Sequence, residues 1–295
     1  MSDSLRQLIS ASAHLSVEEV APGYPVINVA HPTASASVAL HGAHLLSWQP
    51  AGARWSVIYT SPDAVFKEGK AIRGGIPICW PWFHAHPTDP SLPSHGFARI
   101  RFWMLRRVTE DDAAVELEFT LKPSDETRAL FPHEFSTALT VRIGATLSVA
   151  LRTTNLSPEP INIGGALHTY FAVGDLSEIG IAGLEGVDYL DTVGEHVVRT
   201  QEGPIHFGGE IDRIYRAAPP VRIVDRVFGR NIRMESSGSR STVVWNPFFQ
   251  KAAALGDLPA NAYRDFVCVE AANAGDDVRT LMPGDSHTLA MTVRV

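Results

Sequence analysis

The stretch VELEFTL at residues 115–121, with LTVRI at 139–143 and LSVAL at 147–151, decides the fold class. In each segment an apolar residue alternates with a polar or small one. This period of two buries one face of the segment and leaves the other in water, which is typical of antiparallel strands. The chain end, from Leu289 to Val295, repeats the pattern. The sequence therefore predicts a protein built from antiparallel sheets.

The rest of the chain extends this interpretation. Turn-forming residues separate the alternating runs, and the segments 135–143 and 146–154 form a predicted hairpin. Helical patterns are confined to residues 2–10, with Ser2 or Ser4 as the cap, and to residues 125–131. No series of alternating strands and helices occurs, so a parallel α/β fold is not expected.

We accordingly expect an all-β fold, a large antiparallel β-sandwich. Residues 1–295 are predicted to form a single domain, in which residues 1–23 are an N-terminal extension carrying a short helix. The sequence leaves the oligomeric state open, with a monomer as the simplest case. Cys79 and Cys268 each lie in an apolar run and are predicted to be small buried residues, not a disulfide framework.

Charge and hydropathy exclude several classes of partner. The chain has 295 residues, 45% of them hydrophobic, and a formal net charge of -7 without a basic run. Binding to nucleic acid or to an anionic membrane surface is therefore not expected. The N-terminus lacks the apolar core of a signal peptide, and no run of 18 apolar residues occurs, so we expect a cytoplasmic protein.

Three segments break the alternating pattern, and functional sites tend to lie where such patterns fail. Residues 73–99 are dense in Gly, Pro and aromatic residues, residues 162–171 read NIGGALHTYF, and residues 245–273 run from WNPFF to VCVEAAN. We therefore expect the site residues to lie in these segments.

Glu270 is an acidic residue in an otherwise apolar strand, on the same face as Cys268 and Phe266. Burying a lone carboxylate is costly, so the residue is expected either to be functional or to form a structural ion pair. His168 also lies in an apolar segment, where a hydrogen-bonded core histidine is the alternative. The glycines before it, Gly164 and Gly165, predict a close approach of the backbone or a bulge.

Two further segments contain histidine or arginine residues that could belong to a site. His95 and Arg99 lie in PSHGFAR at 93–99, and Arg73 lies in IRGGIP at 72–77. An arginine between apolar and glycine residues could clamp a phosphate or sugar hydroxyls through its fork of donors, or it could pair with a buried acid.

Six segments together carry a resemblance to a known family. They occur in the chain in this order: RGGIPICWPWF (73–83), PSHGFAR (93–99), ALHTYF (166–171), EIDRIY (210–215), VVWNP (243–247) and VCVEAAN (267–273). The set resembles the hexose-6-phosphate mutarotase (glucose-6-phosphate 1-epimerase) branch of the aldose 1-epimerase family, over roughly residues 25–295. The resemblance implies a galactose-mutarotase-like β-supersandwich with a cleft on one sheet.

The resemblance also implies roles for individual residues. Glu270 matches the general base of the family, His168 the general acid and His95 a second active-site histidine. Asp212 matches a ligand of the substrate hydroxyls, although Ile211 stands where threonine is common. Further matches are the binding arginines Arg73 and Arg99, and Ser94, which stands where some members carry glutamine. After Glu270 the chain reads Ala-Ala-Asn, where some members have Pro-Gly.

The implied reaction exchanges the two anomers of an aldohexose 6-phosphate. A base takes the proton of the anomeric hydroxyl, an acid protonates the ring oxygen, and the ring closes again on the other face. A carboxylate and a histidine suit these roles near neutral pH, and no cofactor or metal is needed. Arg73, Arg99 and Lys67 are the cations expected to attract the small-molecule sugar phosphate.

Other functions remain open on the sequence alone. The chain could turn over free aldoses, or it could bind a sugar without catalysis by stacking it on Trp245. Trp80 and Trp82 are expected to be core residues instead. A metal enzyme is a further alternative, because His84 and His86 followed by His95 resemble the histidine pattern of some metal-binding β-barrels. The nearest acid, Asp89, is followed by Pro90 and completes this pattern poorly.

Overall fold

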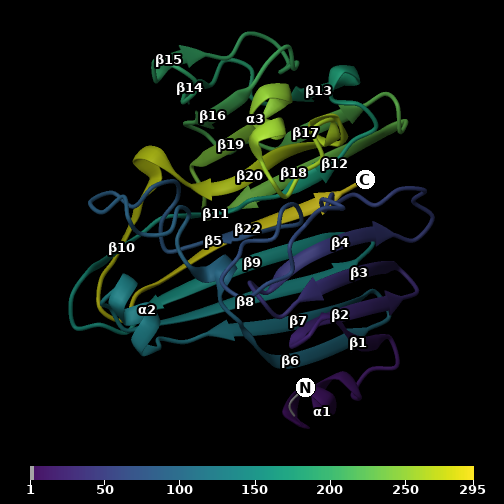
Figure 1. Ribbon diagram of the computed structural model, residues 1–295, viewed down its shortest axis with the longest axis vertical. Helices are drawn as coiled ribbons and strands as arrows, with labels where there is room; N and C mark the ends of the chain where they lie inside the picture. Colours follow the sequence, from purple (N-terminus) through teal and green to yellow (C-terminus); the bar gives the residue numbers. More distant parts are fainter. Residues whose placement is uncertain (1–2) are drawn as a thin grey trace.

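The computed structural model describes residues 3–295 (Figure 1). Its helices are few and short: α1 (Asp3–Ile9), α2 (Asp125–Leu130), α3 (Phe248–Ala254) and the 3-10 turns η1 (Ala98–Ile100), η2 (Leu176–Glu178), η3 (Ala262–Asp265) and η4 (Gly275–Asp277). Both predicted helices are present. Ser4 lies inside α1 and is not its cap, while Ser2 falls outside the described residues. Between residues 3 and 295 no helix has the length and apolar character of a membrane span.

One large sheet contains the segments that predicted the fold. Its eight strands are all antiparallel to their neighbours, and the predicted hairpin is formed by β8 (Phe135–Gly144) and β9 (Leu147–Asn155), which pair Ile143 with Leu147. Their order across the sheet is β13 (Ile179–Ala182), β17 (Val221–Asp225), β18 (Arg230–Ser237), β22 (Ser286–Arg294), β9 (Leu147–Asn155), β8 (Phe135–Gly144), β7 (Ala114–Leu121) and β6 (Met104–Asp111).

Two further sheets lie against this one. The first contains β1 (Leu15–Ala21), β2 (Tyr24–His31), β3 (Ala34–Ala39) and β4 (His44–Pro50). The second has the order β15 (Val197–Thr200), β14 (Asp188–Asp191), β16 (Ile211–Tyr215), β19 (Ser241–Asn246), β20 (Phe266–Asn273), β11 (Gly165–Leu167) and β5 (Ile78–Cys79), and β12 (Tyr170–Ala172) also pairs with β20. A separate pair joins β10 (Ile161–Ile163) to β21 (Arg279–Leu281).

The apolar faces of the sheets close on one another. Strands β2 and β3 pack on β7 and β8, while β11 and β20 pack on β22, so a continuous core runs between the layers. Trp48 of β4 spans the layers with its indole N–H, which donates to the carbonyl of Gly144 at 3.0 Å. The predicted antiparallel β-sandwich is therefore confirmed. Cys79 and Cys268 are buried free thiols, and Trp80 and Trp82 are buried as expected.

Gly75 lies where β4 meets the segment that carries Arg73. A backbone bridge from Leu45 of β4 to Ile76 connects the four-stranded sheet to the site-bearing part of the chain, and a second bridge joins Thr60 to Gly74. Gly75 has a φ of 68°, and a Cβ atom at this position would lie 2.4 Å from the carbonyl oxygen of Leu45. The glycine therefore allows both the turn and the close approach.

Gly75→Ala should destabilise the protein more than Gly52→Ala. Gly52 has a similar φ of 80° but nothing within 4 Å of its Cβ position, so it reports the backbone cost alone. The clash at Gly75 should add about 1–3 kcal/mol, as overpacking does. Urea unfolding of both variants measures the free energies of unfolding. Equal losses would show that the approach to Leu45 is not a tight constraint.

Candidate active site

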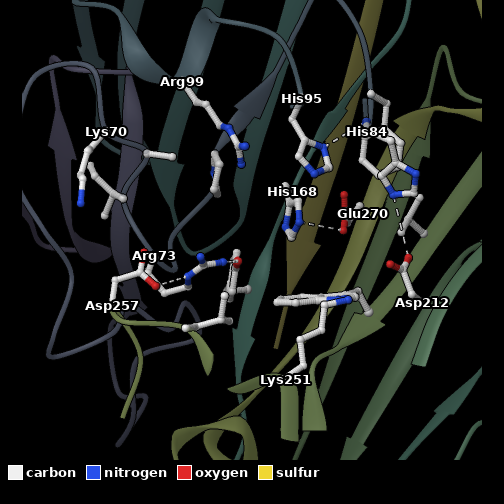
Figure 2. Close-up of a pocket in the computed structure, with 18 residues that line it drawn as sticks. Lys70, Arg73, His84, His95, Arg99, His168, Asp212, Lys251, Asp257 and Glu270 are labelled. Carbon is white, nitrogen blue, oxygen red and sulfur yellow. Dashed lines mark hydrogen bonds and ion pairs between the residues drawn. The ribbon is translucent and has the colours of Figure 1, made fainter. Parts of the chain in front are cut away.

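A pocket of about 440 Å³ opens over strands β16, β19 and β20 (Figure 2). Segments from distant parts of the chain form its walls, including residues 70–73, residues 83–99 and residues 251–257, the last of which begin in α3. The lining residues are Lys70, Ala71, Ile72, Arg73, Pro77, Phe83, His84, His95, Arg99, His168, Tyr170, Asp212, Val243, Trp245, Lys251, Leu255, Asp257 and Glu270.

Glu270 stands at the floor of the pocket. It belongs to β20, a strand whose eight residues are all buried, and its own exposed fraction is 0%. It pairs with Val243 of β19 on one side, and on the other side it faces the break between β11 and β12. Within residues 3–295, its carboxylate oxygens make no contact with hydrogen-bond geometry, and Oε1 is paired with the His168 ring. A buried carboxylate left in this state is costly to the fold.

His168 faces Glu270 from the break between β11 and β12. The distance from His168 Nε2 to Glu270 Oε1 is 3.3 Å. Gly165 allows this placement, because a Cβ atom there would lie 2.4 Å from the carbonyl oxygen of Cys79 on β5. The backbone N–H of His168 donates to the carbonyl of Pro77 at 3.1 Å. The close backbone approach predicted from the two glycines is therefore present.

Burial shifts the two groups of this pair in opposite directions. Burial raises the pKa of Glu270 well above its usual value, Asp212 raises it further, and Arg99 opposes the shift. Burial lowers the pKa of His168 well below its usual value, and Arg99 adds to this shift. Each group on its own therefore favours its neutral form, in which Glu270 is protonated and His168 is not. One proton held between the two side chains, which lie 3.3 Å apart, serves both groups.

His95 lies beside His168 in the pocket (Figure 2). The ring centroids are 5.8 Å apart, and the backbone N–H of His84 donates to Nδ1 of His95 at 3.3 Å. Burial, followed by the neighbouring cation of Arg99, lowers the pKa of His95, so this imidazole is neutral near pH 7. It can offer its Nε2 atom to a bound molecule as a hydrogen-bonding group.

Asp212, a residue of β16, lies at the opposite end of the site. Its Oδ1 atom lies 4.0 Å from Nε2 of His84, a residue that the sequence patterns did not assign to the pocket. Burial raises the pKa of Asp212 and lowers that of His84. His86 turns away, since its ring packs on Trp82 and its Nδ1 accepts from the backbone of Asp89.

The histidine pattern of the metal-enzyme alternative is therefore not assembled as one site, because His84 faces Asp212 whereas His86 packs on Trp82. Of the residues described, one group places three suitable ligand atoms within 4.8 Å of one another, namely His14, His31 and Glu110. None of these residues lines the pocket.

Arg73 and Arg99 both reach the pocket. Arg73 donates from Nε to Oδ1 of Asp257 at 3.0 Å and from Nη1 to the hydroxyl of Tyr170 at 3.3 Å, so the acid-pairing alternative is present in the structure. Arg99 donates from Nη2 to the carbonyl oxygen of Ser94 at 2.9 Å. Ser94 is exposed and does not line the pocket, so it contacts the site through its backbone.

Two lysines line the pocket that the sequence analysis did not single out. Lys70 lies on the wall beside Arg73, whereas Lys67 is exposed and does not line it. Lys251 lies near Asp212 and is ion-paired with Glu210 at 2.6 Å. No local pattern marks either lysine. In Figure 2, Lys70, Arg73 and Arg99 lie to one side of His168, while His84 and Asp212 lie to the other.

Comparison with known proteins identifies relatives along nearly the whole chain. A family model described as "Aldose 1-epimerase" matches residues 25–294. A protein of Escherichia coli K12 named "Putative glucose-6-phosphate 1-epimerase" is 37% identical over 273 residues, which cover 92% of this chain and 90% of that protein. A protein of Cenchrus ciliaris with the same name is 36% identical, covering 85% and 78% of the two chains.

Solved structures agree with this assignment. A crystal structure described as a "putative mutarotase" from Salmonella typhimurium superposes with a TM-score of 0.90 at 35% identity, covering 96% of this chain and 94% of that one. A galactose mutarotase-like protein from Lactobacillus casei, at 20% identity and a TM-score of 0.71, covers 91% and 99% of the two chains and shares the fold. The family match and these relatives show that the chain belongs to the aldose 1-epimerase family.

Proposed function

We propose that the protein interconverts the α and β anomers of an aldohexose 6-phosphate, with D-glucose 6-phosphate as the first candidate. The observation that carries the proposal is the pair of His168 and Glu270, buried 3.3 Å apart at the floor of a pocket with a cationic wall. The names of the relatives from E. coli and C. ciliaris support the same substrate.

The pair supplies the two proton-transfer groups that ring opening needs. Burial favours the shared proton on Glu270, so the reactive state is the minor one in which that proton has moved to His168. In this state the Glu270 carboxylate takes the proton of the anomeric hydroxyl. His168 donates its proton to the ring oxygen as the bond between C1 and that oxygen breaks. Rotation about C1–C2 and the reverse proton transfers then close the ring on the other face.

The neighbouring groups hold the sugar during these steps. Neutral His95 can donate a hydrogen bond to the anomeric oxygen on C1, or accept one from it. Asp212 can accept hydrogen bonds from the other hydroxyls of the sugar ring. Trp245 offers a half-buried aromatic face to the sugar ring. The reaction consumes no external acid, because the proton removed in one direction is returned in the other.

The phosphate is assigned to the wall formed by Lys70, Arg73 and Arg99. Asp257 neutralises part of the Arg73 charge, while Arg99 donates to a carbonyl oxygen and keeps its full charge. A phosphate here would lie on the side of His168 opposite Asp212, which leaves the sugar ring over Glu270.

Mutarotation of α-glucose 6-phosphate beside α-galactose, at matched concentrations, tests the proposal directly. Faster turnover of the phosphorylated sugar supports it. Preference for the free sugar would make the protein a general aldose mutarotase, and binding without turnover would make it a carbohydrate-binding protein.

Glu270→Gln should lower kcat by a factor on the order of 10² to 10⁴, the usual share of a general base. The amide keeps the shape of the side chain but does not accept the proton. The melting temperature should not fall at neutral pH, because the variant removes a carboxylate whose burial disfavours its charged form. Turnover close to that of the wild type would remove Glu270 from the mechanism.

Asp212→Asn should move the acid limb of the kcat/KM profile to lower pH. The base acts only when ionised, so activity falls as pH drops through the pKa of Glu270, which burial and Asp212 raise above 4.5. Removing the charge of Asp212 removes the second of these causes. Comparing both enzymes on one substrate cancels the ionisation of its phosphate. An unmoved limb would mean that Glu270 is not the titrating base.

Arg73→Ala and Arg99→Ala should raise KM for hexose 6-phosphates far more than for a free hexose. A charge-assisted hydrogen bond contributes about 1.5–3 kcal/mol, so each loss should cost roughly 10- to 150-fold in affinity. Arg106→Ala, at an exposed arginine of β6, is the matched control. Equal losses on both sugars together with a lower melting temperature would assign the arginines a structural role.

A further inference from the structure

Aromatic rings enclose the imidazole of His168, whose Nε2 atom faces Glu270 at 3.3 Å. Its Nδ1 atom is buried and has no partner on another of the residues 3–295, although a catalytic histidine is usually oriented through that second nitrogen. The ring of Tyr170 stacks on its imidazole instead, with centroids 5.1 Å apart and planes inclined by 17°. His95 and Trp245 meet it edge-on, each at 5.8 Å.

Tyr170 also contacts the cationic wall. Its buried hydroxyl accepts from Nη1 of Arg73 at 3.3 Å, and Arg73 is anchored through Nε to Asp257. The Tyr170 backbone is fixed on both sides, because its N–H donates to Gly75 and its carbonyl accepts from Tyr59. The ring is therefore the part of Tyr170 through which a change at Arg73 can reach His168.

We infer that Tyr170 is a positioning residue that couples the cationic wall to His168, so that an oxyanion bound at the wall accelerates anomer exchange even in a sugar that carries no phosphate. The inference rests on the proposed function and adds a second activity to it, namely free-hexose mutarotation activated in trans by a dianion.

The physical reason lies in the length of the contact between Arg73 and Tyr170. At 3.3 Å it is longer than the usual N–H···O distance of about 2.9 Å. An oxyanion on the guanidinium fixes the direction of its donors and thereby the position of the Tyr170 hydroxyl. The stacked tyrosine ring then restricts His168 to the orientation that faces Glu270, and binding energy at the remote phosphate appears as a higher kcat.

Sulfate is the probe of choice for the kinetic test. It is a dianion at neutral pH and a weak base, so it adds little uncatalysed mutarotation. The rate on a free hexose is measured with and without sulfate, against sodium chloride at equal ionic strength. In the wild type we expect sulfate to raise kcat about 10-fold, which corresponds to about 1.4 kcal/mol.

Tyr170→Phe separates coupling from packing, because it keeps the stacked ring and removes the contact with Arg73. The ratio of rates with and without sulfate should fall to about one, and kcat for the hexose 6-phosphate should drop more than its KM changes. Tyr59→Phe is the matched control, since Tyr59 is a nearby tyrosine outside the pocket lining that stacks on Phe266. It should keep the wild-type ratio.

An NMR measurement makes the test independent of turnover. Imidazole signals of the ¹⁵N-labelled protein are followed during addition of sulfate, and His168 is assigned by its missing signal in His168→Asn. The His168 signal should shift in the wild type and in Tyr59→Phe, and not in Tyr170→Phe. Absence of this shift in the wild type, or an equal sulfate response in Tyr170→Phe, would overturn the coupling. Failure of the proposed function would instead be seen as no turnover of hexose 6-phosphate by the wild type.

Discussion

The contact between Glu270 and His168 brings an ionisable pair into the middle of a fully buried strand, and the surroundings of the site follow from the cost of doing so. A carboxylate in this position needs a partner that can share its proton, and His168 provides one at 3.3 Å. The break between β11 and β12 is what turns the histidine toward β20. Thr169, the next residue, points the other way and donates to Met291 in the core between the sheets.

The charges of the pocket are arranged around this pair. Cationic groups lie on the side of Arg73 and Arg99, and Asp212 lies beyond Glu270 on the other side. These two sides shift the pKa of Glu270 in opposite directions, since Asp212 raises it and Arg99 lowers it. A substrate with an anion at one end and hydroxyls at the other matches this polarity. The inferred coupling between the cationic wall and His168 depends on the same arrangement, because Tyr170 contacts both Arg73 and His168.

At the floor of the pocket, the side chains that would make the fold most stable differ from those that the proposed reaction needs. Packing alone would be better served by apolar side chains at both positions, as at the neighbouring Cys268 and Val269, which are fully buried. The large core between the sheets can carry the cost, because continuous apolar layers flank the pair on the β22 side. A rigid sandwich thus holds two costly polar groups within reach of proton exchange.

The sequence by itself determined the sandwich, because alternation in segments such as 115–121 and 147–151 is a local property that states which face of each strand is buried. It also marked Glu270 and His168, since an ionisable residue stands out within an apolar strand. Only the tertiary structure decided which cations line the pocket, where Lys70 replaces the expected Lys67, and that Ser94 meets the site through its backbone. It also brought Asp257 to Arg73 across 184 residues and His84 to Asp212. Such contacts depend on how separate strands and loops come together in space, and no local period or spacing in the chain records that arrangement.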